Sequence, residues 1–187
     1  MTKQSKCRLL LCLALSCICV PLAWSRPWNP APDELAADYA IITHNKGVDK
    51  DGNASMTVIM WLVPQRFPEN SPLRQTFEKY VVIGVAHGHI ARSTGVTTFD
   101  KTDTLQPGDG NGNPMKRLTG NNIPPTLAGA MAAMDGIFRQ SLGAFGQGIT
   151  WFVFDPGAIR PCGAGRLIIP YADENYTYEL PLPGCPK

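Results

Sequence analysis

The sequence predicts an α+β fold: a single mixed, mainly antiparallel sheet of about five to seven strands with at least two helices and one disulfide. Three observations indicate it. Residues 80–90 form a long apolar run typical of a central strand, and several shorter β-like segments are separated by turn residues. Two further segments combine a helix start signal with apolar residues at helical spacing. The 18 glycines and 17 prolines indicate many turns and irregular connections.

Residues 1–25 have the pattern of a secretory signal peptide: a basic start, an apolar segment at 9–20, and a small-x-small site that predicts cleavage after Ser25. The apolar segment is shorter than the ~20 residues of a membrane span. We therefore expect an exported protein, periplasmic or extracellular, with no transmembrane segment after signal cleavage. The alternative is lipid modification at Cys17.

Cleavage would leave two of the six cysteines, Cys162 and Cys185. In an exported chain such a pair predicts a disulfide, which closes a loop of about 24 residues and contributes on the order of 3 kcal/mol. The leader also holds three of the 17 basic residues and none of the 15 acidic ones, so the mature charge is 14 − 15 = −1. This balance gives no electrostatic reason to expect nucleic acid as a partner.

Residues 26–187 are predicted to form a single exported domain. Its first part, 26–37, is rich in proline and reads as an extended lead-in. Residues 38–46 and 55–63 then predict a β-hairpin around a polar turn at 49–53.

A short helix is expected after Ser71, which can act as N-cap, with Pro72 at the first helical position. Leu73, Phe77 and Tyr80 continue it as one apolar stripe. The central strand follows directly, and residues beyond it at 95–99 predict another strand that returns antiparallel.

The composition turns polar between residues 100 and 122, which predicts a long surface loop. A second helix is predicted from the prolines at 124–125 to about residue 142, because its apolar residues recur at helical spacing. The C-terminal part predicts three strands, at 149–154, 165–171 and 176–180.

The central strand has two distinct faces, because side chains alternate along a strand. One face carries small residues that would allow close approach of another element. The other face carries apolar residues and then a histidine pair: Val81, Ile83, Val85, His87, His89.

The pair His87 and His89 is the sharpest chemical signal, since two imidazoles on one strand face can share a metal ion. His44 is the one other histidine of the chain and lies on the first predicted strand. If the strands are neighbours, the three histidines could bind zinc or copper. Histidines packed at a strand end are the commoner explanation of such a pair.

Other motifs fail on spacing. The segments 49–53 and 109–113 resemble calcium loops, but their glycines and twelfth positions do not match. No G-x-S-x-G nucleophile elbow occurs. We therefore expect a small secreted or periplasmic binding or interaction domain, not catalytic and without a cofactor, whose partner is an unknown protein or small molecule. The alternative is a histidine-based metal-binding protein or metal-dependent enzyme.

Overall fold

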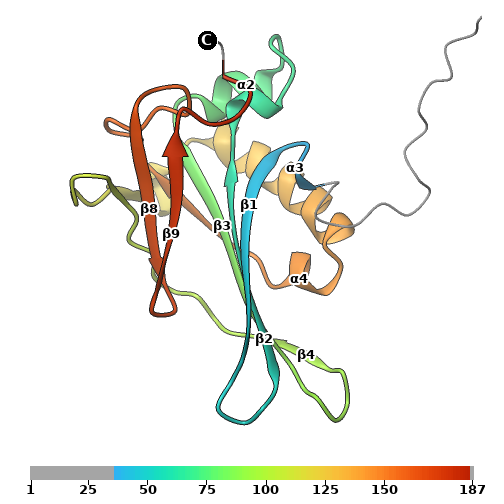
Figure 1. The fold of residues 1–187 in the computed structure, drawn as a ribbon. Coiled ribbons are helices and arrows are strands. Elements are labelled where there is room, and N and C mark those ends of the chain that lie inside the picture. Colours follow the sequence, from blue (N-terminus) through green and yellow to red (C-terminus); the bar gives the residue numbers. More distant parts are fainter. Residues whose placement is uncertain (1–35, 186–187) are drawn as a thin grey trace, which may run out of the picture.

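The computed structural model of the protein describes residues 36–185 (Figure 1). The predicted leader, residues 1–25, and all but the last two residues of the predicted lead-in lie outside this part. Within residues 36–185, no helix is long and apolar enough to cross a membrane.

The predicted antiparallel sheet is confirmed as a six-stranded sheet. Every strand pair in it is antiparallel. Its strands lie in the order β1 (Ala40–Val48), β2 (Ala54–Leu62), β3 (Val81–Ile90), β7 (Thr150–Phe154) and β6 (Arg117–Leu118), while β4 (Thr97–Phe99) also pairs with β3.

β3 is central, as its apolar run predicts. β2 pairs with it along one edge, from Ile83 to Ile90. On the other edge, the first half of β3 pairs with β7 and residues 88–90 pair with β4. The sheet therefore forks at the middle of β3.

A second sheet, additional to the predicted one, contains β5 (Gly108–Asp109), β8 (Gly165–Tyr171) and β9 (Glu174–Leu180). The two residues that connect β8 to β9, Ala172 and Asp173, have φ of 49° and 62°. Positive φ at both positions is the geometry of a type I′ hairpin turn. The inward residues of this hairpin pack against the first sheet around Ile59, Trp61, Ile83, Val85, Phe152, Leu167, Ile169, Tyr176 and Tyr178.

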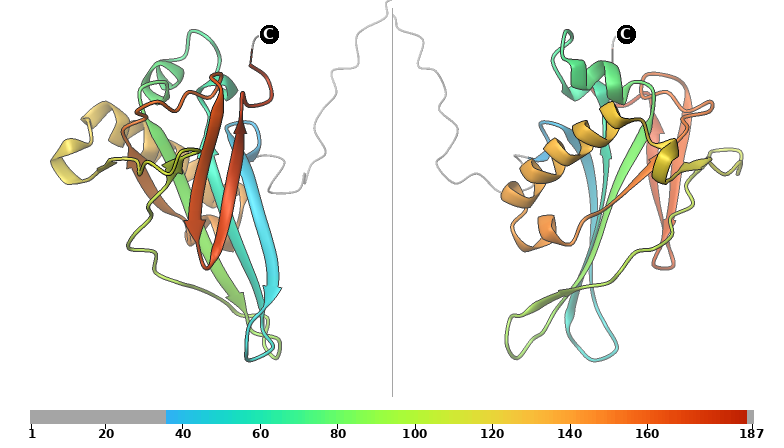
Figure 2. Two further views of the ribbon diagram at one scale, coloured as in Figure 1. Left: turned by 60° about the vertical axis from the view of Figure 1, so that its left-hand side comes forward. Right: turned by 180° about the vertical axis from the view of Figure 1, so that it is seen from behind.

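Helices cover the opposite face of the six-stranded sheet, so the molecule has three layers (Figure 2). As predicted, Ser71 caps the first of them, because its Oγ accepts a hydrogen bond from the N–H of Leu73. The helices are α2 (Pro72–Phe77), α3 (Pro125–Ser141) and α4 (Ala144–Gln147), with 3-10 turns at η1 (Pro64–Arg66) and η2 (Gly120–Asn122). Their core against the sheet includes Met60, Leu62, Phe77, Val82, Leu127, Met134 and Phe138.

The close approach predicted from the small residues of β3 is also found. A Cβ added at Gly84 would lie 2.7 Å from Cζ3 of Trp151, and one at Gly88 would lie 2.9 Å from Cε1 of Phe145. Aromatic side chains therefore occupy the space that side chains at these positions would need.

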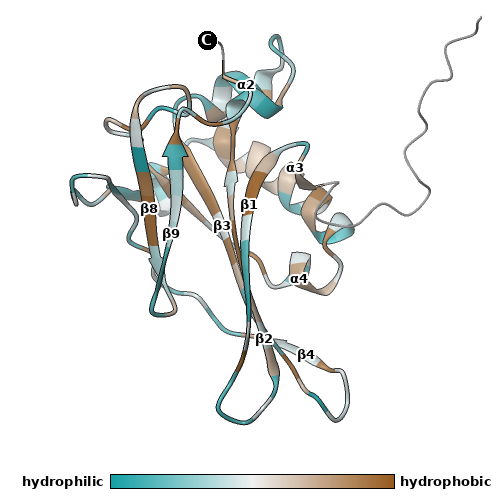
Figure 3. Cartoon of the chain, in the orientation of Figure 1, coloured by the Kyte–Doolittle hydropathy of each residue, from teal (hydrophilic) through white to brown (hydrophobic). Residues whose placement is uncertain are grey.

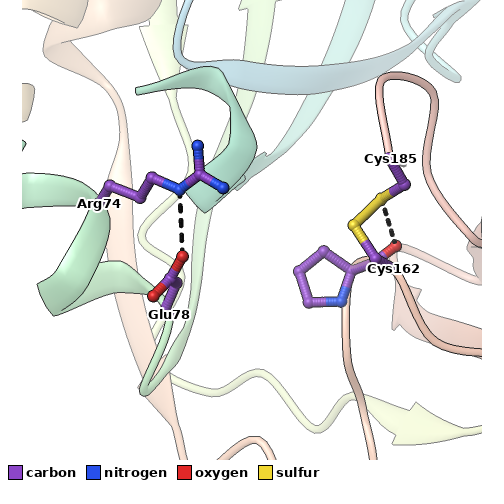
Figure 4. Close-up of a disulfide and its surroundings, with 5 residues drawn as sticks. Arg74, Glu78, Cys162 and Cys185 are labelled. Atoms are coloured by element: carbon purple, nitrogen blue, oxygen red, sulfur yellow. Dashed lines mark hydrogen bonds and ion pairs between the residues drawn. A yellow bond between two sulfur atoms is a disulfide. The ribbon is translucent and has the colours of Figure 1, made fainter. Parts of the chain in front are cut away.

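The predicted disulfide joins Cys162 to Cys185 with a Cα–Cα distance of 5.3 Å. It fastens the C-terminal segment to the loop before β8, on the side of the molecule near α2 (Figure 4). On α2, Arg74 forms an ion pair of 3.1 Å with Glu78.

Candidate metal site

The lower end of the six-stranded sheet extends beyond the helices and the second sheet (Figure 1). It consists of the loop that joins β1 to β2, the second half of β3, and β4. The β1–β2 loop at its tip is largely hydrophilic and the β3–β4 loop is mixed, whereas the upper half of β3 is hydrophobic (Figure 3). The histidine pair of β3 lies where this extended part begins, since His87 still contacts Tyr171 at the end of β8.

Strand register brings a carboxylate beside the two histidines. His87 pairs with Thr57 of β2, and its carbonyl accepts a hydrogen bond of 2.9 Å from the N–H of Asp100. That bond continues the pairing of β3 with β4 by one residue. Residues directly opposite in antiparallel strands have side chains on the same face, so Thr57, His87 and Asp100 share a face with His89.

Nε2 of His89 forms a hydrogen bond with Oδ2 of Asp100, and the distances among these side chains are also compatible with those of metal ligands. Oδ2 of Asp100 lies 3.1 Å from Nε2 of His89 and 3.7 Å from Nε2 of His87. A tetrahedral ion with bonds of ~2.1 Å separates its ligand atoms by about 3.4 Å, and the two distances bracket this value. His87, His89 and Asp100 offer ligand atoms that all lie within 4.8 Å of one another.

The second nitrogen of each imidazole faces an oxygen. Oγ1 of Thr57 lies 2.6 Å from Nδ1 of His87. Nδ1 of His89 is buried without a hydrogen-bond partner among the described residues, and Oδ2 of Asp49 lies 3.7 Å from it. Metal-binding histidines usually donate their second N–H to such an oxygen, which leaves the other nitrogen free to bind the ion.

Two ionisable groups at this end of the sheet have a shifted pKa. Burial lowers the pKa of His87, and His89 lowers it further, while Asp100 acts in the opposite direction. Burial alone would raise the pKa of Asp49, but hydrogen bonds from Asn53 and Asp51 and the nearby His89 together lower it. His87 thus resists protonation, and Asp49, which lies beside His89 but is not one of the three candidate ligands, stays ionised.

One side of the site is open to solvent. The side chain of Asp100 is 55% exposed, that of His89 is 29% exposed, and that of His87 is 15% exposed. The ring of Tyr171 covers His87 at a centroid distance of 6.1 Å, and its hydroxyl lies 2.9 Å from Oγ1 of the buried Thr102. An ion held here would be shielded by Tyr171 on one side and accessible near Asp100.

The structure does not bring His44 to this site, and its predicted role as third ligand is wrong. His44 pairs with Val58, which pairs with Ala86. These residues alternate with Thr57 and His87 and therefore lie on the helix-covered face of the sheet. The neighbours of His87 on β1 and β2 are instead Asn45 and Thr57.

Asp100 was not predicted as a candidate ligand from the sequence, although a signal for it existed. It directly follows the strand that was expected to return antiparallel to β3. Such a return places the residue after the strand beside one of the histidines, but the sequence does not fix which register the two strands take.

Two grooves lie on either side of β1, apart from the histidine pair. One of 510 Å³ lies between β1 and β9 and includes Ile41, Tyr178 and Leu182. The other, of 260 Å³, lies towards α4 and includes Met56 and Phe145. Neither includes a residue of the candidate metal site.

No family model, no curated protein and no solved structure matches this chain. A functional assignment therefore depends on the geometry of the chain itself.

Proposed function

We propose that the protein is a small exported binding domain whose ligand is a divalent transition-metal ion, held by His87, His89 and Asp100. The observation that carries the proposal is the convergence of both Nε2 atoms on Oδ2 of Asp100, at 3.1 and 3.7 Å. The secretory pattern of residues 1–25 and the disulfide support export.

Two imidazoles and one carboxylate favour zinc or copper over magnesium or calcium, which prefer oxygen ligands alone. Copper(II) binds most sites of this kind more tightly than zinc does. Affinity alone therefore does not identify the ion bound in the cell, and both ions belong in the test.

The first experiment measures metal content and affinity. The full chain is expressed with its own leader, purified after export, stripped with a chelator and titrated with zinc and with copper(II). We expect one ion per chain, lost in His87→Ala and in Asp100→Ala. His44→Ala is the matched control, because this exposed histidine lies on the opposite face and its loss is expected to leave the stoichiometry unchanged.

Two results would contradict the proposal. One is a chain that binds neither ion with defined stoichiometry. The other is an equal loss of binding in His44→Ala and His87→Ala, which would indicate adventitious binding to any exposed histidine. Circular dichroism of each variant checks that the fold is retained.

A metal-dependent enzyme is the second candidate, and the open side of the site favours it. Three protein ligands leave at least one position for water or substrate, as in catalytic zinc sites. Hydrolysis of activated esters by the zinc-loaded protein, compared with Asp100→Ala, would test this candidate once binding is established.

A further inference from the structure

The structure contains the same five-residue loop twice, at residues 49–53 and 109–113. In each, Oδ1 of the first aspartate accepts hydrogen bonds from the N–H groups two and four residues later. Its Oδ2 accepts a bond from the side-chain amide of the final asparagine. The fourth residue, Gly52 or Gly112, has φ of 79° or 84°, which favours glycine.

The two loops differ in what else their aspartate faces. The hydrogen bonds to Asp109 come from Asn111 and Asn113 of its own loop. Oδ2 of Asp49 also lies 3.7 Å from Nδ1 of His89. Its bond from Asn53 is correspondingly longer, at 3.2 Å against 2.9 Å in the second loop.

We infer that Asp49 is a positioning residue of the metal site, and that ion binding couples the β1–β2 loop to β3 through His89. This inference rests on the proposed function. Asp49 would then position His89, a role that its counterpart Asp109 does not have.

Nδ1 of His89 is buried and has no hydrogen-bond partner among residues 36–185. When Nε2 binds a cation, the ring becomes a stronger donor at Nδ1–H, and a carboxylate is its preferred acceptor. The 3.7 Å separation exceeds an ordinary hydrogen bond by about 0.8 Å. A small rotation of the imidazole, or a small shift of the loop, closes this gap.

The coupling acts in both directions. If the ion strengthens the contact between Asp49 and His89, the contact strengthens ion binding by the same factor. Loss of such a carboxylate typically weakens metal binding about 10–100-fold. A closed contact would also hold the β1–β2 loop more firmly, because Oδ1 of Asp49 accepts from the N–H groups of Asp51 and Asn53.

The test compares Asp49→Asn with Asp109→Asn in the full chain, using zinc as the probe. Asparagine keeps the oxygen that closes each loop but replaces the second oxygen with a donor. We expect zinc affinity to fall about 10–100-fold in Asp49→Asn and to stay unchanged in Asp109→Asn. Thermal unfolding without zinc shows whether the two variants lose similar stability.

A second measurement uses the unaltered protein and needs no variant to fold. Amide hydrogen exchange at Asp51 and Asn53 is expected to slow when zinc binds, while exchange at Asn111 and Asn113 stays constant. Equal zinc affinity in both variants, or unchanged exchange at Asp51 and Asn53, would overturn the role of Asp49 and leave the proposed function standing. If the chain binds copper(II) but no zinc, copper(II) replaces zinc as the probe in both measurements; a chain that binds neither ion would overturn both the role of Asp49 and the proposed function.

Discussion

Replacement of Gly84 by alanine tests whether β3 is as tightly enclosed as the structure indicates. The added Cβ would lie 2.7 Å from Cζ3 of Trp151 and 2.9 Å from Cγ of Met60. Neither neighbour can move away freely. Met60 is fully buried, and the indole N–H of Trp151 donates a hydrogen bond of 2.9 Å to Oδ1 of Asp135 on α3.

Overpacking of this kind costs about 1–3 kcal/mol of unfolding free energy. In a domain of this size it corresponds to a fall in Tm of about 2–12 °C. Thermal unfolding followed by circular dichroism measures it. Gly129→Ala on α3 is the matched control, because no described atom lies within 4 Å of its added Cβ and it should stabilise the helix by up to ~1 kcal/mol. A Gly84→Ala protein as stable as the original would refute the reasoning.

Two further outcomes are expected. Replacing Cys162 and Cys185 by serine removes the cross-link between two residues that are 23 positions apart. The unfolding free energy, measured by urea titration, should fall by about 3 kcal/mol. An unchanged urea midpoint would contradict this. In the metal-free protein, burial lowers the pKa of His87. As the pH falls below about 6.5, the unfolded chain therefore binds more protons than the folded protein does. Stability should therefore fall between pH 7.5 and 5.5, more steeply than in His87→Gln; parallel curves would exclude His87 as the cause.

The longer strands and helices were largely predictable because local signals determine them, whereas β5, β6 and η2 lie within residues 100–122, which were predicted as a loop. Ser71 and Pro72 mark a helix start, and the uniform apolar character of β3 marks a strand enclosed on both sides. The second sheet was not predicted. The alternation of apolar and polar residues along β8 and β9 shows that one face of these strands is buried, but it does not show which layer of the protein that face packs against. Tyr178 faces inward with Leu167 whether the strands belong to one sheet or to two.

The candidate metal site was predicted only in part, for a different physical reason. Spacing along one strand places His87 and His89 on a common face without further information. Ligands from other strands depend on register, and a shift by one residue moves a side chain to the opposite face. For that reason Thr57 and Asp100 are beside the pair, whereas His44 lies across the sheet.

The fork in β3 has a consequence for the order in which the protein can assemble. Every residue of the candidate metal site, from Asp49 to Asp100, is synthesised before β7. The strand that closes the upper edge of β3, Thr150–Phe154, is made about 50 residues later. During N-to-C emergence, the end of the sheet that carries the histidine pair can therefore be complete while the hydrophobic end of β3 still has an open edge.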